Sequence, residues 1–573
     1  MKKFLQKILF PALFCLNACS GYLDPQQLSI INESDLYRNI NYIEQIWVQC
    51  YSYLPDGHNF TLWAASDEAD AVEDQHESQK FNLGNWSRYD MPDNMWSHYY
   101  KGIKQCCELI ENLQNVTWEE YRVANPSEYE RRTTLMSQYI VEARFLRAYY
   151  YFELVKRYGG VPIVTHRLYL NDADDLYFVK TVKRNTFAEC IDFIVKECDA
   201  VAPLMESSFD LTWKGRATSS AAKALKSRVL LYAASDLFNI EGNTNPLVGY
   251  TSGNRTQRWL DAALAANELI RTDAYRLHGT YRELFTLESN SGSREIIWGR
   301  QAPAVNTLEK ALYPIGYDGG NSGVCPTGDL VDAYEMSNGT LFSWDNPSHA
   351  ANPFGGRDAR LKATVLVNGD KWAGRAVEAY EGGRDGKPVR NATRTGFYMK
   401  KHLVDGLNLV NDYKASREWI YFRYAEILLN YAEAVNHYAG PDFTPGGCRY
   451  TAKEAVNLIR TRALQPLCDV TFSRRGTPLN RDSFAEFVLN ERRVELAFED
   501  MRIWDLKRNM QAEAAIGGNI HGVKITKSES GEVSYARSIV EKRVFSASKM
   551  YFYPIPQSEI SKSDGNLEQN PGW

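Results

Sequence analysis

The chain has 573 residues, a net charge of −5 at pH 7 and a pI near 6.1. This length allows several domains and a large core, and the charge provides no basic surface, so we expect no nucleic-acid partner. The 35 tyrosines and 13 tryptophans exceed what a core needs, and such side chains also supply flat faces for sugars or for partner proteins.

Residues 1–18 have the pattern of a lipoprotein signal peptide. Three lysines within the first seven residues precede an apolar run over 8–16, which is too short to cross a bilayer at about 20 residues per crossing. The sequence Leu-Asn-Ala-Cys then ends at Cys19, and cleavage before this cysteine would leave it acylated. An ordinary secretory signal is the alternative. Because no other stretch is long and apolar enough to span a membrane, we expect the mature chain to be tethered by lipid at Cys19.

Downstream, apolar residues recur at helical spacing in segments that we predict to pack as antiparallel pairs. The first long helix is followed by Gly159, Gly160 and Pro162, which is typical of a helix C-terminus. Small residues at contact positions resemble tetratricopeptide repeats, in which each pair buries its apolar face by stacking on the next. The predicted helices cover 135–158 with 186–204, 219–238 with 258–271, and 419–438 with 451–463, followed by a helix that starts at Ser483.

The helical pattern fades over residues 272–417. Glycine, asparagine, aspartate and aromatic residues dominate there, between short strand-like runs at 295–298 and 363–367. The segment is too aromatic and too rich in apolar runs to be a disordered linker. We therefore predict a mainly α fold of irregular tetratricopeptide-like helix pairs, with a loop-rich insertion subdomain that contains short strands.

The helix expected from Ser483, which opens an S-x-x-E capping box, carries acidic residues on its apolar face. Glu491 and Glu495 fall inside the apolar stripe, so their carboxylates must be paired if that stripe is buried. Two glutamates one turn apart on a core-facing stripe cannot easily straddle a glycosidic bond. We therefore expect internal ion pairs with Arg492, Arg493 or an arginine of a neighbouring helix.

Two C-terminal runs carry a family resemblance. ERRVELAFEDMRIWDLKR, from Glu491, and YPIPQSEI with NLEQNPGW, from Tyr553, resemble signatures of the SusD/RagB family of outer-membrane nutrient-uptake lipoproteins from Bacteroidetes. The chain departs from the first signature at Asp500, where the family usually has glycine; we expect this to alter only a helix-end turn. The resemblance implies a SusD-like α/α superhelix whose helical half contacts a TonB-dependent transporter and whose variable half holds ligand.

The predicted organisation follows from this resemblance together with the helical pattern. It comprises a signal peptide at 1–18, an N-terminal region with helix pairs at 19–271, a ligand-binding insertion at 272–417, and a C-terminal region completing the scaffold at 418–573.

Motifs for catalysis or cofactor binding are weak. The glycine-rich run from Gly382 to Lys387 lacks P-loop spacing, and the chain has no G-x-S-x-G, H-E-x-x-H or C-x-x-C motif, so we expect no catalytic site, zinc or other cofactor. One acidic cluster could attract Ca²⁺ but lacks the order of an EF-hand loop, so we interpret it as a solvated loop or helix end. Its members are Asp67, Glu68, Asp70, Glu73 and Asp74.

Candidate ligand-binding residues lie in two segments that combine aromatic and polar side chains. A sugar presents C–H faces to an aromatic plane and hydroxyls around its rim, so aromatic rings beside Asp, Asn, Arg or His suit it. The resemblance also implies that these segments carry glycan contacts. The candidates are Trp63, Asp67, His76, Asn85, Trp86 and Arg88 in the first segment, and Tyr313, Tyr317 and Asn321 in the second.

Three functions remain open at this point. The first is a non-catalytic, outward-facing outer-membrane lipoprotein that captures oligosaccharide or polysaccharide and delivers it to a TonB-dependent transporter. The second is a lipoprotein on the same scaffold that binds peptide or another nutrient. The third is a surface glycoside hydrolase, which the absence of a convincing acid pair disfavours.

Overall fold

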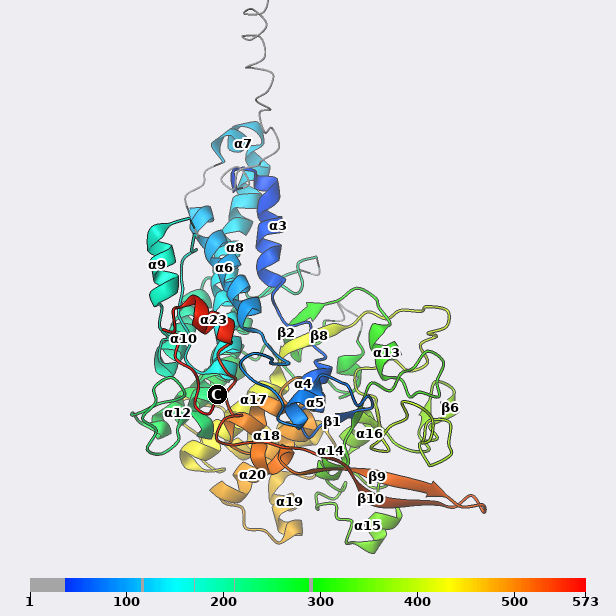
Figure 1. The fold of residues 1–573 in the computed structure, drawn as a ribbon. Helices are drawn as coiled ribbons and strands as arrows, with labels where there is room; N and C mark the ends of the chain where they lie inside the picture. Colours follow the sequence, from blue (N-terminus) through cyan, green and yellow to red (C-terminus); the bar gives the residue numbers. More distant parts are fainter. Residues whose placement is uncertain (1–36, 115–117, 170, 211, 288–291) are drawn as a thin grey trace, which may run out of the picture.

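The computed structural model describes residues 37–114, 118–169, 171–210, 212–287 and 292–573. The predicted signal peptide and Cys19 lie outside these residues. The fold is mainly helical, as predicted, with short two-stranded sheets. Figure 1 shows a column of long helices at one end of the molecule, and a loop-rich region beside the C-terminal helices.

The helices α3 (Ile40–Tyr51), α6 (Trp96–Gln114) and α8 (Pro126–Tyr158) form this column, and α10 (Phe187–Val201) packs against α8. α8 starts nine residues before the predicted start, because Pro126 occupies its first turn, where a missing N–H costs nothing. It ends, as predicted, at Gly159, whose φ of +75° favours glycine.

The second helical group continues the stack. α11 (Ser219–Ala234) packs on α12 (Arg255–Ile270), which packs on α17 (Tyr424–Ala439). α17 in turn contacts both α18 (Ala452–Arg462) and α20 (Arg481–Glu495). The predicted pairs of residues 219–238 with 258–271 and of 419–438 with 451–463 are therefore confirmed, although α17 begins later than expected.

Shorter helices connect these groups and shape the loop-rich region. They are α4 (Phe60–Ala64), α5 (Ser78–Asn82), α7 (Glu119–Ala124), α9 (Ala173–Thr181), α13 (Thr307–Leu312), α14 (Gly328–Ala333), α15 (Pro347–Ala351), α16 (Ala359–Thr364), α19 (Cys468–Arg475), α21 (Arg502–Arg508), α22 (Ala512–Ile516) and α23 (Gln557–Lys562), with 3₁₀ turns at Asp236–Phe238 and Glu283–Phe285.

In the described residues, every sheet consists of two antiparallel strands. They are β1 (Ala69–Ala71) with β3 (Val324–Pro326), β2 (Ile296–Gln301) with β8 (Glu418–Arg423), β4 (Val365–Leu366) with β7 (Tyr398–Met399), β5 (Lys371–Trp372) with β6 (Arg375–Ala376), and β9 (Asn519–Lys527) with β10 (Val533–Lys542).

Two predicted boundaries were wrong in the strand regions. Residues 419–423 were expected to open a helix, but they form most of β8, because aromatic and β-branched side chains pair well with β2. The strand-like run 363–367 holds only the two residues of β4, which follow α16 directly. The run at 295–298 is confirmed as the start of β2.

The acidic face of α20 is buried and paired with arginines, as predicted. The carboxylate of Glu491 forms ion pairs with the guanidinium groups of Arg360 at 2.6 Å and of Arg460 at 3.0 Å. Glu495 lies 2.7 Å from Arg423 and also pairs with Arg360 and Arg462. These arginines come from α16, β8 and α18, so α20 is joined to three separate parts of the chain.

The arginines next to the two glutamates have other partners. Arg492 pairs with Asp505 at 3.2 Å, and Arg493 pairs with Asp67 at 2.7 Å. The predicted start of this helix was also wrong. Asn480 is the N-cap, and Ser483 is the third helical residue, whose side chain accepts the N–H of Asn480 in return.

Candidate ligand-binding pocket

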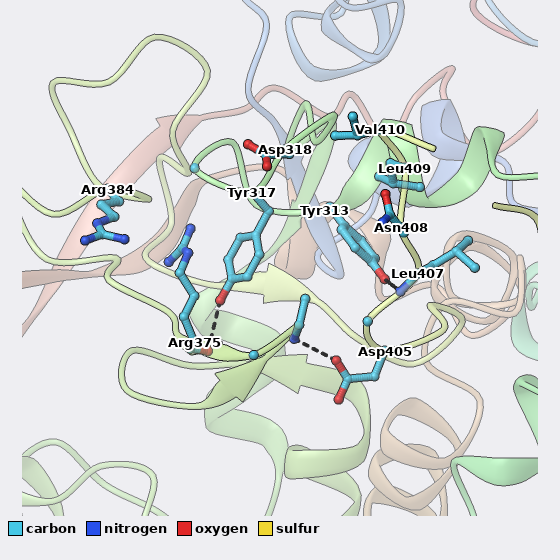
Figure 2. A pocket seen from close by; sticks show the side chains of 14 residues that line it. Tyr313, Tyr317, Asp318, Arg375, Arg384, Asp405, Leu407, Asn408, Leu409 and Val410 are labelled. Atoms are coloured by element: carbon cyan, nitrogen blue, oxygen red, sulfur yellow. Dashed lines mark hydrogen bonds between the residues drawn. The ribbon is translucent and has the colours of Figure 1, made fainter. Parts of the chain in front are cut away.

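The loop-rich insertion contains an open pocket of about 800 Å³. Its walls come from four segments, all within residues 272–417: residues 313–318 after α13, residues 373–375 in the β5–β6 hairpin, Arg384, and residues 405–410 (Figure 2). A pocket of this size lies within the range of sites that bind small molecules or short oligomers.

Tyr313 fixes one wall of the pocket. Its side chain is buried, its hydroxyl donates to the carbonyl of Val404, and it accepts the N–H of Leu407 at 3.2 Å. The ring also meets Trp372 edge-on at 5.6 Å. Tyr313 therefore holds the 405–410 segment against the hairpin and is not itself free to stack on a ligand.

Tyr317 and Arg375 form the centre of the pocket (Figure 2). The guanidinium carbon of Arg375 lies 3.6 Å from the centroid of the Tyr317 ring, and the Tyr317 hydroxyl donates to the carbonyl of Arg375 at 3.3 Å. Asp385, which is fully buried, accepts two bonds from the guanidinium at 2.7 and 2.8 Å. Burial raises the pKa of Tyr317, so its hydroxyl stays protonated and can donate.

Exposed polar side chains surround this centre. Asp318, Arg384, Asp405 and Asn408 line the pocket and are all solvent-accessible. Asp405 is oriented by the N–H of Ala373 at 2.8 Å. Carboxylates, an amide and a guanidinium together offer both donors and acceptors, which is the combination that sugar hydroxyls require.

The second predicted segment contributes to this pocket, but only in part. Tyr313 and Tyr317 line it, as described. Asn321 is exposed outside the lining, and its Oδ1 accepts a bond from Asn391 at 3.0 Å.

The first predicted segment lies elsewhere in the molecule. Trp63 is 1% exposed and packs against Phe498, with ring centroids 5.3 Å apart. Trp86 is 4% exposed and packs against Trp573, with centroids 4.4 Å apart. Because other side chains enclose both indoles, we do not include them in the proposed site.

The polar candidates of the first segment are also away from the pocket. His76 is half-buried, with Nδ1 2.9 Å from the hydroxyl of Ser78. Asn85 is exposed, and the half-buried Arg88 lies over the exposed ring of Tyr89 at 5.3 Å. None of these residues lines the 800 Å³ pocket.

The interpretation of the acidic cluster as solvated was wrong for three of its members. Asp67, Glu68 and Asp70 are buried. Burial alone would raise the pKa of Asp67, but Arg493 and Arg502 hold it well below its usual range. Asp67 therefore stays ionised and serves as a structural ion-pair partner.

Three other members of the acidic cluster, Asp70, Asp74 and Glu68, have partners of their own. Arg394 reaches Asp70 at 2.8 Å and Asp74 at 2.9 Å. Burial raises the pKa of Glu68 to about 8, and its carboxyl accepts the N–H of Phe498. In the described part of the chain, no three His, Cys, Asp or Glu side chains are grouped to hold a metal ion.

Sequence reasoning missed several pocket residues. Arg375 sits in a hairpin of two-residue strands, and Asp405 and Asn408 lie in a loop with no regular pattern. The composition of that loop, VDGLNLVNDY from Val404 to Tyr413, could have indicated a binding segment, because it mixes polar loop residues with an aromatic residue. Tyr413 is 60% exposed.

Among the described residues, no helix has the length and apolar character that a membrane crossing needs.

Two family models match the chain, one over each half. A model described as the SusD family matches residues 287–573, and a model described as "Starch-binding associating with outer membrane" matches residues 28–231. SusD-like protein P2 of Formosa agariphila is 22% identical over 517 residues, covering 90% of this chain and 87% of that protein.

Solved structures share the fold across nearly the whole chain. A SusD-like protein from Bacteroides fragilis is 25% identical, with a TM-score of 0.75 and coverage of 95% of this chain and 99% of its own. A SusD-like carbohydrate-binding protein from the same species is 24% identical, with a TM-score of 0.73 and coverage of 92% and 99%. Surface glycan-binding protein A from Bacteroides fluxus is 22% identical, with a TM-score of 0.62 and coverage of 93% and 99%.

The expectation that the chain is not an enzyme agrees with these comparisons, since SusD proteins are non-catalytic carbohydrate-binding proteins. The C-terminal signatures, the helical scaffold and a family model that spans half of the sequence lead to one assignment: the chain belongs to the SusD family.

Proposed function

We propose that this chain is a non-catalytic lipoprotein of the outer cell surface that captures an oligosaccharide or polysaccharide and delivers it to a TonB-dependent outer-membrane transporter. The observation that carries the proposal is the 800 Å³ pocket in the insertion, whose walls combine Tyr317 with exposed carboxylate, amide and guanidinium groups. The family's association with glycans and with the outer membrane supports it.

The pocket's chemistry suits capture and release. Arg375 is held by Asp385 and by the Tyr317 ring, so the centre of the site is preorganised before ligand arrives. The rim groups Asp318, Arg384 and Asn408 are solvent-accessible and can exchange water for sugar hydroxyls. The pocket thus binds through hydrogen bonds and one aromatic edge, which gives reversible binding.

The proposed delivery step requires a partner that crosses the outer membrane. A lipid at Cys19 would hold the protein at the membrane surface, beside its transporter. Affinity purification of the full-length lipoprotein from solubilised membranes should bring down a TonB-dependent barrel protein in stoichiometric amount. Recovery of the lipoprotein without any such barrel would contradict the delivery step.

The binding step can be tested with a panel of polysaccharides and peptides. Affinity electrophoresis should show retention by at least one polysaccharide, with no release of reducing ends on incubation. Asp318→Ala should weaken that retention about threefold or more, because it removes an exposed hydrogen-bonding group of the pocket. Asp345→Ala, which changes an exposed aspartate elsewhere, is the control and should not change it.

Each other outcome points to one of the alternatives. Retention of peptides alone would indicate a peptide-binding lipoprotein, and released reducing ends would indicate a glycoside hydrolase. Equal retention by the wild type and Asp318→Ala would move the glycan site away from this pocket.

A further inference from the structure

A second cavity, of about 370 Å³, lies at the other end of α13 from the 800 Å³ pocket. Two residues of the turn before α4, Asp56 and Gly57, line it together with Trp419 of β8. Its opposite wall comes from the insertion, with Gln301 at the end of β2 and Thr307 at the start of α13. This cavity is therefore formed where the insertion meets the helical scaffold.

The second cavity has the chemistry of a polar ligand site. The Nε2 of Gln301 is buried and has no hydrogen-bond partner within the described residues. A buried amide donor left unpaired is unfavourable, so a ligand oxygen that accepted its hydrogen would be favoured. At the rim, Arg300 and Asp56 form an ion pair, with 44% and 87% of their side chains exposed.

His58 also lines the second cavity. Burial and the nearby charge of Arg417 lower the pKa of His58 to about 3, so its imidazole is neutral at pH 7. A neutral imidazole has one donor and one acceptor nitrogen. Phe60 and Trp419 supply apolar surface beside it. The lining therefore combines aromatic surface with polar and charged groups, including Gln301, Arg300 and Asp56, as the 800 Å³ pocket combines Tyr317 with its polar rim.

The two cavities are close and are joined by one segment of chain. α13 has six residues, so its axis is about 9 Å long. Residues 404–417 run antiparallel beside it, since Val404 contacts Glu309 within α13 and Asp412 contacts Asn306 at its start. Near the first pocket, Leu407 donates to the Tyr313 hydroxyl at 3.2 Å. Near the second, Val305 and Ala415 form a bridge.

This segment carries two exposed side chains, one in the lining of the first pocket and one on the stretch of chain that leads to the second cavity. Val410 is 72% exposed and lines the first pocket, and Tyr413, three residues on, is 60% exposed. The position of Tyr413 is fixed, because Asn306 donates to its carbonyl at 3.0 Å and to Asp412 at 2.9 Å. An exposed tyrosine on an anchored backbone is a suitable surface for stacking.

Resting on the function proposed above, we infer that the protein recognises an extended saccharide chain, which occupies both cavities and crosses Tyr413 between them. The ligand class is then a polysaccharide or a long oligosaccharide. Fragments of one or two sugars fill the 800 Å³ pocket alone and bind weakly. Gln301 and Tyr413 are ligand contacts for the long chain only, whereas Asp318 contacts ligands of every length.

The test uses size-fractionated fragments of the polysaccharide that retains the protein in affinity electrophoresis. The affinity of the full chain for each fragment is measured by isothermal titration calorimetry. Wild-type affinity should rise at least tenfold from the shortest bound fragment to fragments of eight or more sugars. Tyr413→Ala should lower affinity for the long fragments about five- to tenfold and leave the shortest unchanged. Gln301→Leu should have the same length dependence, whereas Asp318→Ala should weaken binding at every length.

Tyr89→Ala is the matched control, because Tyr89 is 74% exposed and lines neither cavity. The inference is overturned if affinity does not depend on length, or if Tyr413→Ala behaves as Tyr89→Ala does at all lengths. In either case, continued binding that Asp318→Ala weakens would leave the proposed function standing. If no saccharide is retained at all, the proposed function itself fails.

Discussion

Nη1 of Arg423 lies 2.7 Å from Oε1 of Glu495, and both side chains are almost fully buried. The pair joins β8, at the end of the insertion, to α20 in the C-terminal scaffold. Arg423 also pairs with Glu295 next to β2 at 2.7 Å and with Glu499 at 2.6 Å. The family signature on α20 therefore fixes the strand pair on which the insertion is built.

Glu495→Gln should lower the free energy of unfolding by about 3–5 kcal/mol, because Arg423, Arg360 and Arg462 would keep buried charges without this carboxylate. Chemical denaturation with urea, followed by tryptophan fluorescence, measures the change. Glu529→Gln, at an exposed glutamate of the β9–β10 turn, is the control and should change it by less than about 0.5 kcal/mol. Similar effects of the two substitutions would show that the ion-pair network is not needed for stability.

Lys507 makes stability depend on pH in a predictable direction. Its ammonium is buried with no hydrogen-bond partner among the described residues, 4.4 Å from the centroid of the Tyr553 ring. Burial lowers the pKa of Lys507 to about 7, whereas an unfolded lysine titrates near 10.4. Between these values the unfolded chain binds more protons, so this lysine makes the free energy of unfolding rise from pH 7 to pH 10.

Lys507→Met should remove that rise and should stabilise the fold at pH 6 by about 1–3 kcal/mol, because no unpaired charge is then buried. Urea titrations of both proteins at pH 6, 8 and 9.5 would measure this. Lys542→Met, at an exposed lysine of β10, is the control. Parallel pH profiles for the wild type and Lys507→Met would contradict the prediction.

The helical scaffold was largely predictable from the sequence, because apolar residues at helical spacing identify long helices without information from the rest of the chain. Boundaries were less reliable where a second signal competed. The run from Trp419 to Arg423 continues directly into a helix, and only its pairing with β2, more than a hundred residues away, makes it a strand. The arginine partners of Glu495 were equally hidden, because they lie on β8, α16 and α18.

The candidate pocket was predictable only in part, because it is assembled from four segments. Tyr317 could be proposed from its neighbours in the sequence. Arg375 could not, because only the folded chain brings its guanidinium onto the Tyr317 ring. Aromatic type was also a poor guide to exposure. The large, apolar indoles of Trp63 and Trp86 are buried, whereas Tyr413, with a hydroxyl that tolerates water, is on the surface.

Asn480 should prove to be the residue that caps α20. Its side chain accepts the N–H groups of Asp482 and Ser483 at 3.0 and 3.1 Å, so Asn480→Ala should cost about 1 kcal/mol of unfolding free energy. Ser483→Ala should cost less, because the Ser483 hydroxyl accepts one N–H, that of Asn480, and its bond to the carbonyl of Pro478 does not satisfy a helix N–H. Urea denaturation of both variants distinguishes the assignments, since a larger effect at Ser483 would restore it as the N-cap.

Cys19→Ala should abolish lipid attachment. If residues 1–18 are a lipoprotein signal, the variant will not be labelled by a radioactive fatty acid in growing cells and will no longer sediment with membranes. Cys448→Ala is a suitable control, because this half-buried thiol lies far along the chain and is not expected to carry lipid. Undiminished labelling of Cys19→Ala would rule out the predicted anchor.

Asp385 should be a positioning residue for the ligand pocket, because it touches Arg375 and not the open space. Its buried carboxylate accepts two bonds from Arg375 and one from the N–H of Glu378 at 2.8 Å. In Asp385→Asn the ion pair is lost, and Arg375 is no longer held over the Tyr317 ring. We expect saccharide affinity to fall about tenfold, which corresponds to about 1.4 kcal/mol, in titration calorimetry.

A positioning role predicts more than a loss of affinity. The wild type should bind with a smaller entropy penalty than Asp385→Asn, since the variant must order Arg375 during binding. Arg375→Lys should resemble Asp385→Asn, because an ammonium keeps the charge but cannot make the paired bonds of a guanidinium. Asp345→Asn is the control for a surface amide. If Asp385→Asn binds as the wild type does while Asp318→Ala does not, the preorganised centre contributes nothing and the rim alone holds the ligand.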